Sequence, residues 1–162
     1  MLTIRVSGQD AVLHPSGALY LPEHGALLVA DAHFGKAVSF RKLGVPVPEA
    51  TTAATLQSLD DAIARTGARE LVFLGDFLHS ARSHAPATLA SLHAWRERQA
   101  ALRLTLVRGN HDARAGDPPG SLLVRVVDEP WRVGPFALCH HPEPEGGAHV
   151  LARHRDASVE RG

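Results

Sequence analysis

The sequence predicts an α/β fold in which mixed β-sheet packs in layers against flanking helices. Short apolar segments typical of buried strands alternate with helical segments through the first two thirds of the chain, and the last third is mostly β in pattern. Polar, chemically reactive residues follow these apolar segments directly. Since ligands in α/β sheets bind beyond the carboxyl ends of strands, the pattern that predicts the fold also predicts where a site lies.

Strands are expected where short apolar or alternating segments are bounded by turn-forming residues. The expected strands are Leu2–Val6, 18–21, Ala26–Ala30, 71–74, 102–107, 122–127, Phe136–Cys139 and His149–Ala152. Helices are expected over residues 48–66 and 86–100, where apolar residues recur at helical spacing. Gly67 can supply a left-handed cap to the first helix, and Pro86 suits the first turn of the second. A loop is expected over residues 116–120.

Length and composition indicate one soluble domain over residues 1–162, which is long enough to bury a core. No stretch approaches the ~18 apolar residues that span a membrane, and no secretory signal is recognisable. The single cysteine, Cys139, excludes an internal disulfide, is expected to be buried, and favours a cytoplasmic protein. Lys and Arg together number 17 and balance 17 Asp and Glu, which argues against a broad basic surface but not against a local arginine cluster.

The residues that follow the apolar segments suit metal chemistry. They are Asp31-Ala32-His33, Gly75-Asp76, Gly109-Asn110-His111-Asp112, His140-His141 and, after Arg153, His154. Carboxylate, imidazole and amide groups together suit Mn²⁺, Fe²⁺ or Zn²⁺, and no cysteine cluster offers a soft thiolate site. Alone, each motif also fits a turn, a helix cap or a buried histidine. Their occurrence in this order, each after a strand, predicts a metal site.

In order and spacing, these motifs resemble those of the calcineurin-like metallophosphoesterases: Asp-x-His, Gly-Asp, Gly-Asn-His-Asp/Glu, a later strand-ending His, and Gly-His-x-His. More narrowly, the chain is similar to the bacterial ligase-associated DNA-damage-response endonucleases. The similar segments are LLVADAHFGKAVSFRKLGVPVPE, GDFLHS, LVRGNHD and GPFALCHHPEP. The resemblance covers nearly the whole chain and implies a metallophosphoesterase-type α/β sandwich.

The resemblance also implies two divalent metal ions, with Mn²⁺ first and Fe²⁺ or Zn²⁺ as alternatives. The implied ligands are Asp31 and His33 for the first ion, Asp76 bridging both ions, and Asn110, His140 and His154 for the second. His140 is preferred to His141 because it directly ends its strand.

Other residues would act on the substrate. The resemblance implies that His111 protonates the leaving oxygen or steadies the phosphoryl group, and that Asp112 orients His111. Lys36 and Arg41 could contact a nucleic-acid phosphate, or lie in a solvated loop.

Near its end the chain departs from the family pattern. Where the family has Gly-His-x-His-Pro, this sequence has Arg-His-Arg-Asp-Ala, so Asp156 stands in place of a histidine that binds the first metal. Aspartate can bind Mn²⁺ through oxygen, whereas Arg153 and Arg155 would weaken cation binding. The chain ends at Gly162, and strands that close the family fold are expected to be missing.

The implied function is hydrolysis of phosphodiester bonds by water that two metal ions activate, in a DNA endonuclease or phosphodiesterase of DNA repair. DNA would be the substrate, an ATP-dependent DNA ligase and other repair proteins the partners, and no membrane is involved. Two alternatives stay open: an enzyme for small nucleotides or phosphomonoesters, and a catalytically impaired member that binds a DNA ligase.

Residues outside the motifs have simpler interpretations. We expect His14, His24, His84, His93 and His149 at the surface. Trp95 and Trp131 are expected as packing groups rather than base-stacking platforms.

Overall fold

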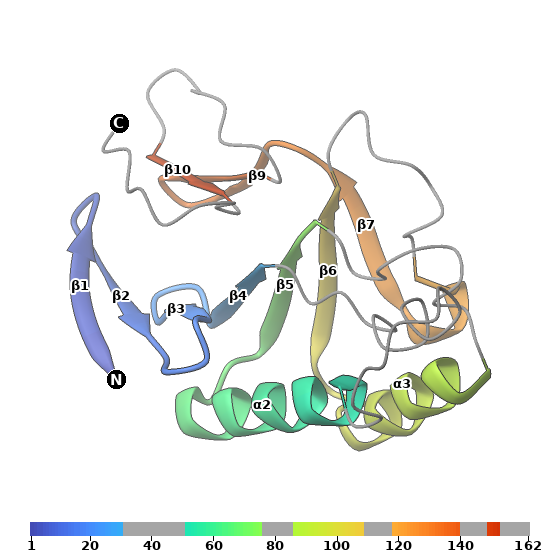
Figure 1. Ribbon diagram of the computed structural model, residues 1–162. Helices are drawn as coiled ribbons and strands as arrows, with labels where there is room; N and C mark the ends of the chain where they lie inside the picture. Colours follow the sequence, from blue (N-terminus) through green and yellow to red (C-terminus); the bar gives the residue numbers. More distant parts are fainter. Residues whose placement is uncertain (31–50, 76–85, 109–117, 140–148, 153–162) are drawn as a thin grey trace, which may run out of the picture.

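The computed structural model describes residues 1–30, 51–75, 86–108, 118–139 and 149–152 (Figure 1). Its centre is a seven-stranded sheet whose strand order follows the sequence. The strands are β1 (Leu2–Val6), β2 (Gln9–Leu13), β3 (Leu19–Leu21), β4 (Ala26–Ala30), β5 (Glu70–Leu74), β6 (Arg103–Arg108) and β7 (Val124–Asp128). The first four pair antiparallel, and β4 to β7 pair parallel, so the sheet is mixed.

Two further layers cover the faces of this sheet. The helices α2 (Thr51–Thr66) and α3 (Pro86–Arg98) lie on one face, and a three-stranded sheet lies toward the other (Figure 1). The small sheet consists of β8 (Trp131–Val133), β9 (Phe136–Cys139) and β10 (His149–Ala152), in the order β10-β9-β8. The layered α/β fold predicted from the sequence is therefore confirmed.

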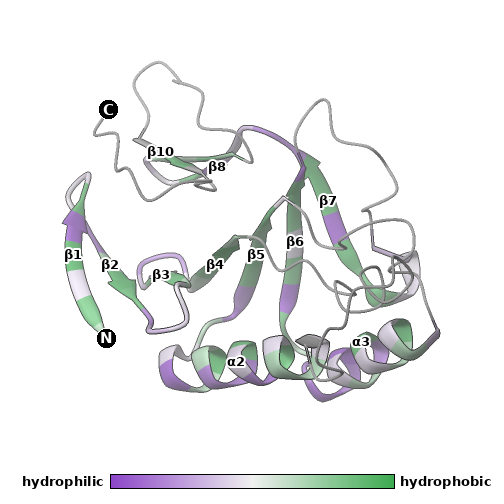
Figure 2. Ribbon diagram, in the orientation of Figure 1, coloured by the Kyte–Doolittle hydropathy of each residue, from purple (hydrophilic) through white to green (hydrophobic). Residues whose placement is uncertain are grey.

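Alternation along the buried strands assigns side chains to the two layers. In β5, Leu71 and Phe73 pack with the helices, whereas Val72 and Leu74 pack with Phe136 and other residues of the small sheet. This is the two-residue period of a strand with both faces covered. Figure 2 shows hydrophobic residues along most of β4, β5 and β6, as expected for the middle of three layers.

The helices begin and end close to the predicted positions. α2 ends at Thr66, where Gly67 has a φ of 70° and its N–H donates to the Ile63 carbonyl at 2.9 Å. The predicted left-handed cap is thus confirmed. α3 ends at Arg98, slightly before the predicted residue 100, and no helix in the described ranges is long and apolar enough to cross a membrane.

Two strands were not predicted. β2 pairs with β1 across a two-residue turn at Ser7 and Gly8, whose φ values are 49° and 78°. β8 pairs with β9 across a turn at Gly134, with a φ of 55°. In the region predicted as a loop over 116–120, Gly120 begins a short 3-10 helix, η3 (Gly120–Leu122), while residues 116 and 117 lie outside the described residues.

Candidate functional site

The carboxyl ends of three parallel strands lie side by side at one edge of the central sheet. Ala30 at the end of β4 pairs with Leu74 of β5, and Leu74 pairs with Val107 of β6. Since neighbouring strands are ~4.8 Å apart, these ends span about 10 Å. In the sequence, Asp31 follows Ala30 directly, and Asp76 comes two residues after Leu74. The edge is therefore the part of the fold from which the predicted motifs continue.

The end of β5 shows why its motif contains a glycine. Gly75 has a φ of 76°, a left-handed conformation that side chains with a Cβ rarely adopt. Its N–H donates to the Val107 carbonyl of β6 at 2.9 Å, which fixes the turn to the neighbouring strand. The chain thus leaves β5 in a defined direction immediately before Asp76.

An ion pair joins the ends of β6 and β7. The Arg108 guanidinium lies 3.8 Å from the Asp128 carboxylate of β7, and its side chain is 25% exposed. The Glu129 N–H donates to the Arg108 carbonyl at 3.0 Å, so the chain beyond β7 is also tied to this edge. Gly109 and Asn110 follow Arg108 in the sequence.

The small sheet has a comparable edge. β9 and β10 are parallel and end in register, with Cys139 paired to Ala152. Leu138 packs in the same core as Leu74 and Val107, which places β9 against the central sheet. Cys139 is buried, as predicted. In the sequence, His140 follows Cys139 directly, and His154 comes two residues after Ala152.

The predicted site residues themselves lie outside the described residues. They are the metal-ligand candidates Asp31, His33, Asp76, Asn110, His140, His154 and Asp156, the catalytic candidates His111 and Asp112, and the substrate-binding candidates Lys36 and Arg41. Within the described ranges, His, Cys, Asp and Glu do not form a group that could hold a metal ion. The metal site and its residues stay predictions.

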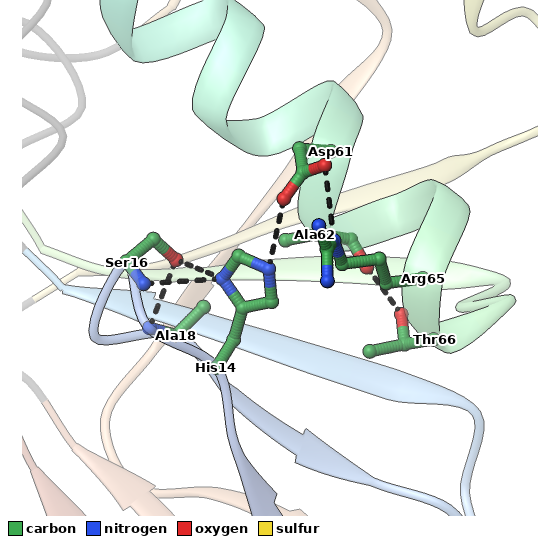
Figure 3. Close-up of polar contacts among 7 residues, drawn as sticks. All are labelled: His14, Ser16, Ala18, Asp61, Ala62, Arg65 and Thr66. Carbon is green, nitrogen blue, oxygen red and sulfur yellow. Dashed lines mark hydrogen bonds and ion pairs between the residues drawn. The ribbon is translucent and has the colours of Figure 1, made fainter. Parts of the chain in front are cut away.

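A buried histidine on the helix side corrects one expectation. His14, predicted at the surface, is 7% exposed (Figure 3). Its Nδ1 accepts from the Ser16 backbone N–H at 3.1 Å, so Nε2 carries the proton and donates to Asp61 Oδ2 at 3.1 Å. Asp61 also accepts from Arg65 Nε at 3.1 Å, and this hydrogen bond lowers the pKa of the Asp61 carboxyl below its ordinary value.

Serine, histidine and aspartate together invite comparison with a nucleophilic triad. The Ser16 hydroxyl lies 2.7 Å from His14 Nδ1, but the Ser16 backbone N–H occupies the same lone pair. A nitrogen already bound by an amide is a poor proton acceptor for the hydroxyl. The cluster therefore acts as a structural connection between the β2–β3 turn and α2. No sequence pattern predicts this cluster, because His14 and Asp61 are 47 residues apart.

The fold is similar to that of a nuclease of known structure. A mixed seven-stranded sheet with helices on one face is a nuclease-like α/β fold. The crystal structure of Pseudomonas putida nuclease MPE matches this chain with a TM-score of 0.83 and 48% sequence identity, over 93% of this chain and 71% of that one. This chain belongs to the family of that nuclease. No family model and no curated protein matches the sequence.

Proposed function

We propose that this chain is a metal-dependent phosphoesterase that hydrolyses phosphodiester bonds of DNA. The observation that carries the proposal is 48% identity to a nuclease over 93% of the chain. At such identity both the fold and the residues of a site are commonly shared. The in-register ends of β4, β5 and β6 add support, because each leads into a motif rich in metal-binding side chains.

The donor set fits divalent metal ions. The carboxylates of Asp31 and Asp76, the Asn110 amide and the imidazoles of His33 and His140 supply oxygen and nitrogen ligands that Mn²⁺, Fe²⁺ and Zn²⁺ accept. His154 and Asp156 would complete the set. When bound, two such ions supply Lewis acidity and lower the pKa of water.

The protein's own residues would bind and protonate the substrate. His111 would donate a proton to the oxygen that leaves phosphorus, and Asp112 would hold its imidazole in the required orientation. Lys36 and Arg41 would contact a phosphate of the nucleic acid.

The finer assignment is also a proposal. We place the chain in the calcineurin-like metallophosphoesterases, near the ligase-associated DNA-damage-response endonucleases, with a role in DNA repair beside an ATP-dependent DNA ligase. The motif order supports this assignment, and a relative that is a nuclease agrees with it.

A cleavage assay tests the proposal. The purified chain is incubated with end-labelled single-stranded DNA and Mn²⁺, with EDTA and the Asp76→Asn variant as controls. We expect cleavage only by the unaltered chain with metal. Phosphate release from nucleotides without DNA cleavage would favour the small-substrate alternative. No hydrolysis of any phosphoester, with well under one manganese ion per chain, would reject the enzyme and favour the impaired, partner-binding alternative.

A further inference from the structure

An arginine of β7 stacks on a tryptophan of the small sheet. The Arg125 guanidinium of β7 lies over the Trp131 ring, 4.7 Å from the ring centroid. Trp131, the first residue of β8, is half-buried, and Arg125 and the neighbouring Arg132 are exposed. The cation–π contact holds one face of the guanidinium against the indole.

Strand pairing puts Trp131 near the strand end from which one of the predicted motifs continues. Trp131 pairs with Leu138 of β9, two residues before His140 in the sequence. At the start of the same connection, Asp128 pairs with Arg108, two residues before Asn110. The β7–β8 connection therefore joins the carboxyl edge of the central sheet to the small sheet (Figure 1).

Carboxylates of the described ranges do not neutralise the charge of this group. Among the residues that the structure describes, neither Arg125 nor Arg132 forms an ion pair with a carboxylate. Asp128, the nearest acid to Arg125 along β7, lies 3.8 Å from Arg108 instead. Arg125 and Arg132 are thus two exposed cations, without a carboxylate partner among the described residues, in a chain whose net charge is zero.

We propose that Arg125, Trp131 and Arg132 form a subsite for unpaired nucleotides of the strand being cleaved. A base stacks on the outer face of the Arg125 guanidinium, which Trp131 supports from behind, and Arg132 contacts a phosphate. Bases inside a duplex have no free face, so the subsite selects single-stranded nucleic acid. Trp131 remains a packing group, as expected from the sequence, and the arginine provides the stacking surface. The inference rests on the proposed function.

Binding without metal tests the subsite separately from catalysis. A fluorescein-labelled single-stranded oligonucleotide is titrated in EDTA, so that no cleavage occurs. Arg125→Ala is expected to weaken binding about fivefold or more, the usual effect of losing one stacked base. Arg125→Lys keeps the charge but not the planar group, and should lose most of the same affinity without changing the salt dependence.

Oligonucleotide binding by variants of Arg132 and of a distant arginine provides two further comparisons. Arg132→Ala should reduce the slope of log K against log salt by ~0.7, the value for one phosphate contact on a single strand. Arg98 is also exposed, at 59% of its side chain, but it ends α3 near the start of β6, at the opposite sheet edge, and it pairs with Asp60 at 3.4 Å. Arg98→Ala should bind the oligonucleotide like the unaltered chain.

An oligonucleotide with an abasic residue and a small phosphodiester substrate distinguish failure of the subsite from failure of the proposed function. An abasic residue in the oligonucleotide should weaken binding to the unaltered chain and have little effect on Arg125→Lys. Hydrolysis of bis(p-nitrophenyl) phosphate with Mn²⁺ by the unaltered chain tests the proposed function separately. If the unaltered chain hydrolyses this diester but Arg125→Ala binds oligonucleotide normally, or no oligonucleotide binds at all, the subsite is wrong and the phosphoesterase stands. If the diester is not hydrolysed, the proposed function itself fails.

Discussion

Replacing Gly75 by alanine tests whether the end of β5 positions the site. Gly75 has a φ of 76°, and this conformation costs an L-residue about 1–2 kcal/mol. The smaller entropy of the unfolded alanine chain offsets about 0.4–1 kcal/mol of that cost. We therefore expect the free energy of unfolding to fall by ~1 kcal/mol, which lowers Tm by about 2–4 °C in a chain of this size.

Gly67 offers a matched control at the other end of β5. Its φ is 70°, and a Cβ added there meets nothing within 4 Å. Gly67→Ala should therefore lose a similar amount of stability. The two variants should differ in hydrolysis, because only Gly75 precedes Asp76 directly, and a displacement of ~1 Å in a catalytic group can cost about 100-fold in rate.

The assay combines thermal unfolding with hydrolysis of bis(p-nitrophenyl) phosphate in Mn²⁺, at a temperature where both variants are folded. Gly75→Ala should lose at least about tenfold in rate, and Gly67→Ala should retain the rate of the unaltered chain. Equal rates in the two variants would refute the reasoning that links the backbone at the end of β5 to catalysis.

Four other changes test separate parts of the account. Asp76→Asn should abolish hydrolysis because the charge shared by both proposed metal ions is lost, and retention of most of the rate with saturating metal would reject a bridging role. Asp156→His should raise the rate if this position is an altered ligand, and no increase counts against that interpretation. Phe73→Ala removes a fully buried ring and should cost about 3–5 kcal/mol in urea denaturation, while a loss below ~1 kcal/mol would contradict its core position. The lowered pKa of Asp61 stabilises the fold above the ordinary carboxyl pKa, and this contribution disappears as pH falls through the lowered value; Asp61→Asn should therefore flatten the fall in Tm below about pH 4, and an unchanged profile would exclude this linkage.

Strands that are apolar and bounded by turn residues could be predicted with their bounds. Ala26–Ala30 and Phe136–Cys139 agree with the structure because both are buried apolar runs that need no partner to be recognised. β2 begins with Gln9 and Asp10, and it becomes a strand because the Ser7-Gly8 turn sets its register against β1. The two-residue turn was the available signal. β8 has only three residues, and it is recognisable as a strand only from its pairing with β9. A segment this short carries no strand pattern of its own in the sequence.

Side-chain contacts between residues far apart in the sequence could not be predicted from the sequence. His14 follows a polar turn pattern that suits the surface, yet packing against α2 buries it beside Asp61. The stacking of Arg125 on Trp131 likewise joins two strands of different sheets. For the candidate site, the sequence predicted which strands lead into the motifs, and the register of β4, β5 and β6 agrees with a common edge. The identity of the ligands stays a prediction.

Anomalous scattering from a crystal of this chain grown with Mn²⁺ tests the central proposal most directly. We expect a pair of manganese peaks beyond the carboxyl ends of β4, β5 and β6, with the Asp76 carboxylate in contact with both ions. Manganese absent from that edge, or bound only at other places on the surface, would contradict the proposal.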